Sequence, residues 1–102
     1  MASRPTATPA DPEHGARFVL ERVRCTEAGE AAYSALVLGA GGEEHAMRVA
    51  IAADGTVDVS APDDAPAWMV KHVEGLSRQV RTSGQREGVW PRTIRRWKDA
   101  PT

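Results

Sequence analysis

The sequence is poor in cysteine and has no long apolar run. Cys25 is the single cysteine of the 102 residues, so the chain can form no internal disulfide, and a disulfide-stapled secreted scaffold is excluded. We therefore expect a reducing compartment, the cytoplasm. No apolar run approaches the roughly 20 residues that a membrane-spanning helix needs, so we expect no membrane insertion.

Lysine, isoleucine and asparagine are also scarce. The chain has 2 Lys, 2 Ile and no Asn, against 17 Ala and 11 Arg, and this bias suggests GC-rich codons and a bacterial source. Proline punctuates residues 1–15, which lack an apolar core segment and are predicted to form a disordered N-terminal tail rather than a signal peptide. The length then predicts a single domain over residues 16–98 and a frayed C-terminus over residues 99–102.

Four segments in the first part of the chain are rich in the residue types that favour strands. They are Arg17 to Thr26, Ala31 to Leu38, Glu44 to Ala53 and Thr56 to Ala61. Short links with glycine join them, which predicts an antiparallel meander. At the last link, a three-residue loop over 53–55 places Ile51 opposite Val57, whereas a two-residue turn would place it opposite Asp58. We therefore expect the three-residue loop.

The same reasoning predicts which side chains point to the core. A three-residue loop over 27–29 and a five-residue loop over 39–43 place one apolar set on one face: Val19, Val23, Tyr33, Ala35, Val37, Met47, Val49, Ile51, Val57 and Val59. Glu21 is the misfit in this set. It is either a buried carboxylate, and then a candidate functional group, or it is turned to solvent by a bulge in an edge strand, which we favour.

The opposite face is expected to be polar, with an apolar patch at one end. The patch consists of Phe18, Leu20, Leu36 and Leu38. Leaving such side chains in water forgoes roughly 1.5 to 3 kcal/mol each, so we expect a second helix, a second copy of the chain or a partner protein to cover them.

Two helices are expected after the strands. Met69, Val73, Leu76 and Val80 recur at helical spacing, after Asp63 or Asp64 as N-cap and before a stop at Ser83-Gly84, and Glu74 and Arg78 form an i,i+4 pair. Trp90, Ile94 and Trp97 predict a second, short helix over 91–98. The expected fold class is α+β: a four-stranded antiparallel meander followed by one long and one short C-terminal helix packed on the sheet.

The charges are divided along the chain. Residues 1–67 carry five arginines and eleven acids, a net charge of −6, whereas residues 68–98 carry eight cations and two acids, a net charge of +6. The two parts can neutralise each other within the fold, or the basic part can bind a polyanion. The second reading makes nucleic-acid binding the alternative function, with these candidate residues: Arg86, Arg92, Arg95, Arg96 and Lys98.

No catalytic, metal or cofactor motif emerges. His14, His45, His72 and Cys25 lie in four different segments without metal-ligand spacing, and Cys25 is expected to be a small buried apolar residue. The glycines of residues 39–42 match no phosphate-binding loop. We therefore expect no cofactor and a small non-enzymatic protein-interaction or regulatory module, which forms a homodimer or binds a protein partner through the apolar patch.

Overall fold

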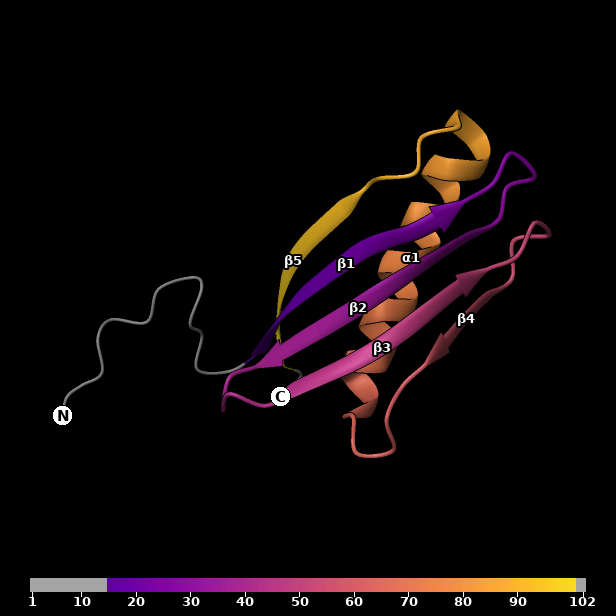
Figure 1. Ribbon diagram of the computed structural model, residues 1–102. Helices are drawn as coiled ribbons and strands as arrows, with labels where there is room; N and C mark the ends of the chain where they lie inside the picture. Colours follow the sequence, from indigo (N-terminus) through magenta and orange to yellow (C-terminus); the bar gives the residue numbers. More distant parts are fainter. Residues whose placement is uncertain (1–14, 101–102) are drawn as a thin grey trace, which may run out of the picture.

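The computed structural model describes residues 15–100, and over this range the chain forms five antiparallel strands and one helix (Figure 1). The strands are β1 (Gly15–Cys25), β2 (Ala31–Gly39), β3 (Glu44–Ile51), β4 (Val57–Ser60) and β5 (Thr93–Asp99), and the helix is α1 (Ala67–Glu87). The strand order is β4-β3-β2-β1-β5, and α1 lies across one face of the sheet. The α+β class and the antiparallel meander are confirmed. The prediction of four strands and two helices is wrong, because residues 93–99 form a strand.

The predicted terminal segments fall largely outside residues 15–100. This applies to residues 1–14, His14 included, and to residues 101–102. Gly15 and Asp99, which were assigned to the tail and to the frayed end, are paired with each other in β1 and β5.

All three hairpins of the meander have a three-residue loop with glycine at its third position. Gly29, Gly42 and Gly55 have φ angles of 91°, 90° and 94°, a backbone conformation that glycine adopts without strain. The predicted loops over 27–29 and 53–55 are confirmed, and Ile51 lies opposite Val57. The five-residue loop over 39–43 is wrong, since the amide of Gly39 donates to the carbonyl of Glu43 and leaves a loop over 40–42.

The pairing of β2 and β3 differs by two residues from the predicted pairing, which set Val37 against Met47 and Tyr33 against Ile51. Tyr33 lies opposite Val49 rather than Ile51. Side chains alternate between the two faces of a strand, so a shift of two residues leaves every side chain on its predicted face. The inward positions of β2 and β3 are therefore as predicted.

A bulge in β1 has the opposite effect. The register changes between Arg22 and Arg24, so that Phe18 lies opposite Val37 instead of Leu38. A slip of one residue exchanges the faces. Glu21 is exposed, as the bulge hypothesis predicts, although β1 is not an edge strand.

The exchange of faces corrects the predicted core. Phe18 and Leu20 point toward α1 and are completely buried, whereas Val19 and Val23 do not belong to the core. The core between the sheet and α1 consists of apolar side chains from five elements and the segment before β5: Ala16, Phe18, Leu20, Ala31, Tyr33, Ala35, Val37, Met47, Val49, Ile51, Met69, Val73, Leu76, Val80, Trp90 and Ile94. Val57 and Val59 of β4 are partly buried at its edge. One face of the sheet is thus closed by the helix.

Helix α1 has the predicted apolar stripe but different ends. It begins after Pro66, and no side chain caps its first turn, so the predicted caps Asp63 and Asp64 are wrong. It continues past the predicted stop at Ser83-Gly84 and ends at Gly88, whose φ of 72° is left-handed. The amides of Gly88 and Val89 donate to the carbonyls of Gly84 and Ser83 and satisfy the end of the helix.

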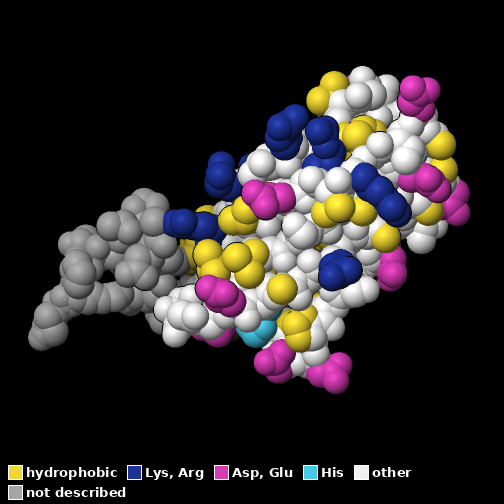
Figure 2. Space-filling view, in the orientation of Figure 1, with side chains coloured by type: hydrophobic (Ala, Val, Ile, Leu, Met, Phe, Trp, Pro, Cys, Tyr) yellow, Lys and Arg dark blue, Asp and Glu magenta, His cyan; other side chains and the backbone are white. Residues whose placement is uncertain are grey.

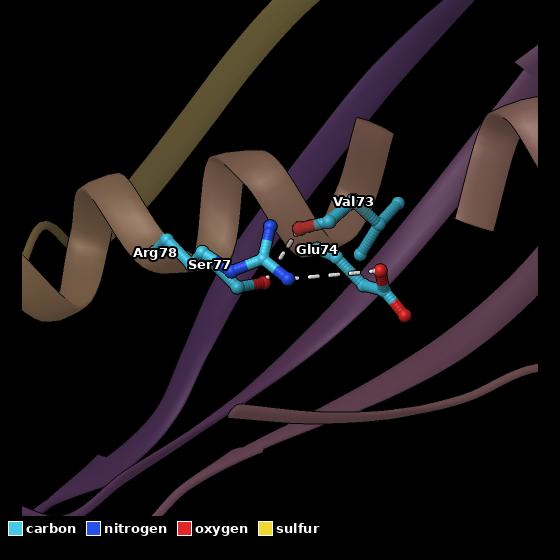
Figure 3. Close-up of polar contacts among 4 residues, drawn as sticks. All are labelled: Val73, Glu74, Ser77 and Arg78. Atoms are coloured by element: carbon cyan, nitrogen blue, oxygen red, sulfur yellow. Dashed lines mark hydrogen bonds and ion pairs between the residues drawn. The ribbon is translucent and has the colours of Figure 1, made fainter. Parts of the chain in front are cut away.

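The polar side of α1 follows the prediction (Figure 3). Arg78 and Glu74 are 3.9 Å apart across one helical turn, which confirms the i,i+4 pair. The hydroxyl of the buried Ser77 donates to the carbonyl of Val73 at 2.7 Å. This bond satisfies a polar group that would otherwise be costly at a helix-sheet interface.

Three hydrogen bonds hold the connection after α1 against the sheet and so position β5 beside β1. The guanidinium of Arg22 donates to the carbonyl of Trp90 at 2.8 Å, and its backbone amide donates to the carbonyl of Arg92 at 2.8 Å. The Tyr33 hydroxyl donates to the carbonyl of Pro91. Burial raises the pKa of Tyr33 to about 12, with Arg22 opposing the shift, so the hydroxyl remains a donor throughout the physiological pH range.

We expect His72 to make the stability of the fold sensitive to mild acid. Its ring packs edge-on against Phe18 with 4.5 Å between centroids, and its buried Nε2 has no hydrogen-bond partner within residues 15–100. Burial, helped by the charge of Lys98, lowers the pKa of His72 below its usual 6.5. The unfolded chain therefore takes up the proton first, and the free energy of unfolding should fall as the pH drops from 6.5 to the folded-state pKa.

The slope of the free energy of unfolding against pH is measured by urea unfolding at a series of pH values. These values lie above the range where carboxylates protonate. The His72→Gln variant should lack the same component. An unchanged slope in that variant would assign the acid sensitivity to another group.

Candidate interaction surface

The other face of the sheet has no covering element within residues 15–100. Figure 2 views this face, on which hydrophobic, basic and acidic side chains alternate. We call it the open face. It is formed by Arg17, Val19, Glu21, Val23 and Arg24 of β1, Ala32, Ser34, Leu36 and Leu38 of β2, Glu44, Ala46, Arg48 and Ala50 of β3, Asp58 and Ser60 of β4, and Thr93, Arg95 and Trp97 of β5.

Only half of the predicted apolar patch lies on the open face. Leu36 and Leu38 are there, and Leu36 is 37% exposed. Phe18 and Leu20 are in the core instead, because the bulge turns them toward α1. The prediction that these four side chains share a face is therefore wrong. Val19, directly opposite Leu36, takes their place.

The strand register arranges the open face in rows, since directly opposite residues of paired strands project to the same side. From β5 toward β4 the rows are Trp97, Arg17, Leu38, Glu44; then Arg95, Val19, Leu36, Ala46; then Thr93, Glu21, Ser34, Arg48, Ser60; and finally Arg24, Ala32, Ala50, Asp58. Leu36 and Ser34 lie at the centre of this arrangement.

The two sides of β2 differ in shape. On β1 the open face carries large side chains, and Val23 at the bulge is 65% exposed. On β3 it carries the small residues Ala46 and Ala50. Two shallow hollows result, one of about 580 Å³ beside Val23, Ala32 and Ala50, and one of about 510 Å³ beside Leu36 and Ala46.

The residues of the nucleic-acid alternative are distributed over different surfaces. Arg95 lies opposite Val19 and belongs to the open face, whereas Arg96 and Lys98 lie opposite Phe18 and Ala16 and project to the helix side. Arg86 is in the last turn of α1, and Arg92 precedes β5. A helix would have gathered Arg92, Arg95 and Arg96 on one side, but a strand alternates them.

The remaining chemical groups do not form a site within residues 15–100. Cys25 is exposed at the end of β1, so the prediction that it is buried is wrong. His45 is buried at the start of β3, and over the described range no cluster of three or more His, Cys, Asp or Glu side chains could hold a metal ion. Over the same range, no helix is both long and apolar enough to span a bilayer. No protein-family model, curated protein or solved structure matches the chain.

Proposed function

We propose that the protein is a small non-enzymatic interaction module that self-associates through the open face of its sheet. The observation that supports this most directly is the uncovered face itself. Helix α1 covers one face of the sheet. On the open face, Val19, Leu36 and Trp97 are partly exposed. A sheet face with apolar side chains at its centre and charges around them is typical of an interface core and its rim.

The edges of the sheet support self-association less well than its face. Edge strand β4 has only four residues. Edge strand β5 carries Arg95, Arg96 and Lys98, and charged side chains on an edge oppose pairing with a second strand. Two copies paired through β5 about a twofold axis would bring these cations together.

Nucleic-acid binding is the alternative function. The open face alternates cations with acids: Arg17, Arg24, Arg48 and Arg95 against Glu21, Glu44 and Asp58. A surface that binds phosphates needs cations gathered on one side with few acids among them. This mixture favours a protein surface as the partner.

Leu36→Lys should weaken self-association by roughly tenfold or more. Leu36 is 37% exposed in the single chain, so the variant removes about 0.5 to 1 kcal/mol of apolar burial from each of two symmetric copies, and each 1.4 kcal/mol corresponds to a factor of ten. Sedimentation velocity over a concentration series measures the dissociation constant. Val89→Lys is the matched control, because Val89 is 57% exposed but lies in the connection after α1.

A wild-type chain that stays monomeric at every concentration contradicts the proposed function. The same series with single- and double-stranded oligonucleotides at two salt concentrations tests the alternative. Binding that falls with salt and is lost in Arg92/Arg95/Arg96→Ala would favour nucleic acid as the partner.

A further inference from the structure

We infer that the two copies stack face to face about a twofold axis nearly parallel to β2, and that Glu21 and Arg48 select the partner. This inference rests on the proposed function. Rotation about such an axis keeps each row in register and places β1 of one copy over β3 of the other. Aligned sheets cross at about 30°, so the axis lies within roughly 15° of β2.

The charges of the central row match in this arrangement. Glu21 on β1 and Arg48 on β3 flank Ser34 of the strand between them. Within one chain they are two strands apart, about 10 Å. In the dimer Glu21 faces the partner's Arg48, and Arg48 faces the partner's Glu21. One surface thus supplies both halves of two ion pairs, which suits a second copy of this chain.

The shapes match as well. Val19 lies over the partner's Ala46. The bulge residue Val23, between the rows of Glu21 and Arg24, lies over the hollow of about 580 Å³ that the partner's Ala50 lines. Leu36 lies on the partner's Leu36 at the axis. Large side chains of β1 therefore meet small side chains of β3, which lets the two sheets approach to the usual separation of about 10 Å.

A twofold axis across the strands is less favourable. Centred on Ser34, it places Glu21 on the partner's Glu21. Centred on Leu36, it avoids that repulsion and sets Arg17 on the partner's Glu21 and Glu44 on the partner's Arg48. It also places Arg95 on the partner's Arg95 and Leu38 on the partner's Ser34. Like charges in contact cost several kcal/mol at an interface.

The face is large enough for a dimer. The nine residues of β2 rise about 30 Å, and five strands span about 20 Å. The face then offers about 600 Å² in each copy, or about 1,200 Å² in total, which is at the lower end of specific interfaces. We therefore expect a reversible dimer rather than an obligate one.

Charge exchange between Glu21 and Arg48 tests the inference. Glu21→Arg and Arg48→Glu should each weaken the homodimer by roughly tenfold or more, since each places like charges opposite each other twice. An equimolar mixture of the two variants should form a heterodimer, because both ion pairs are restored with their signs complementary. The double variant Glu21→Arg/Arg48→Glu should regain the homodimer.

Controls and outcomes separate the inference from the proposed function. Glu87→Arg and Arg86→Glu, exposed on the last turn of α1, carry the same charge changes and should leave the dimer unchanged. Circular dichroism confirms that each variant is folded. A wild-type dimer that neither single variant weakens, or that the double variant fails to restore, overturns this geometry and leaves self-association standing. An axis across the strands through Ser34 predicts the first result, and one through Leu36 predicts the second. A monomeric wild type overturns both.

Discussion

Leu20→Ala should lower the free energy of unfolding by about 2 to 5 kcal/mol, whereas Leu36→Ala should lower it far less. The two substitutions are chemically identical, and the residues lie on neighbouring strands, since Leu20 is opposite Ala35, the residue before Leu36. Leu20 is completely buried between Ala35 and Ile94 on the face that α1 covers. Truncating it leaves a cavity that the surrounding core cannot fully close.

Leu36 has a different environment in the single chain. It is 37% exposed on the open face, so water occupies the space that truncation leaves, and only part of the transfer free energy is lost. Urea unfolding followed by circular dichroism measures both variants. The experiment belongs at the lowest usable protein concentration, where self-association adds nothing to the apparent stability.

The comparison reports directly on the bulge in β1. Without the bulge, Leu20 and Leu36 would share the open face and the two variants would lose similar amounts. Equal losses would therefore show that β1 keeps the uninterrupted register that the hairpin loop alone predicts. A large loss at Leu20 alone agrees with a change of register between Arg22 and Arg24.

The bulge also shows how far the sequence determines this fold. Turn glycines and alternating apolar residues correctly predicted β2, β3 and β4, because every strand there keeps a period of two. In β1 a single extra residue exchanged the faces, and the one sign of it in the sequence was Glu21 on an otherwise apolar face. The bulge that turns Glu21 to solvent also turns Phe18 and Leu20 toward α1.

Strand β5 could not be predicted from the sequence for a different reason. Trp90, Ile94 and Trp97 satisfy helical spacing, and a segment this short can satisfy either period. What decides is the unpaired edge of β1, with the connection fixed by Arg22 and Tyr33. These contacts join residues about 60 to 70 positions apart in the sequence, so no local pattern could reveal them.

The candidate site was only partly predictable as a result. Leu36 and Leu38 were correctly placed on the second face, because β2 has no irregularity. Val19 was predicted on the core face, and the bulge places it on the open face instead. The proposed pairing of Glu21 with Arg48 was not predicted, because an uninterrupted register of β1 places Glu21 on the face opposite to that of Arg48.

Gly84→Ala should destabilise the protein by about 1 to 3 kcal/mol, although alanine favours a helix by about 1 kcal/mol over glycine. A Cβ at residue 84 would overlap the indole of Trp90, which packs directly on the helix there. The indole ring would have to move, although the backbone carbonyl of Trp90 is held by a hydrogen bond from Arg22. The loss should therefore extend to the attachment of β5.

A second glycine of the same helix provides the control. A Cβ at Gly75 meets nothing within 4 Å, so Gly75→Ala should stabilise the protein by up to about 1 kcal/mol, the propensity gain alone. Chemical unfolding of both variants, and of Gly84→Ala combined with Trp90→Ala, measures the coupling in a double-mutant cycle. Removing the indole should abolish the penalty at residue 84. Additive losses would mean that Trp90 does not pack on Gly84.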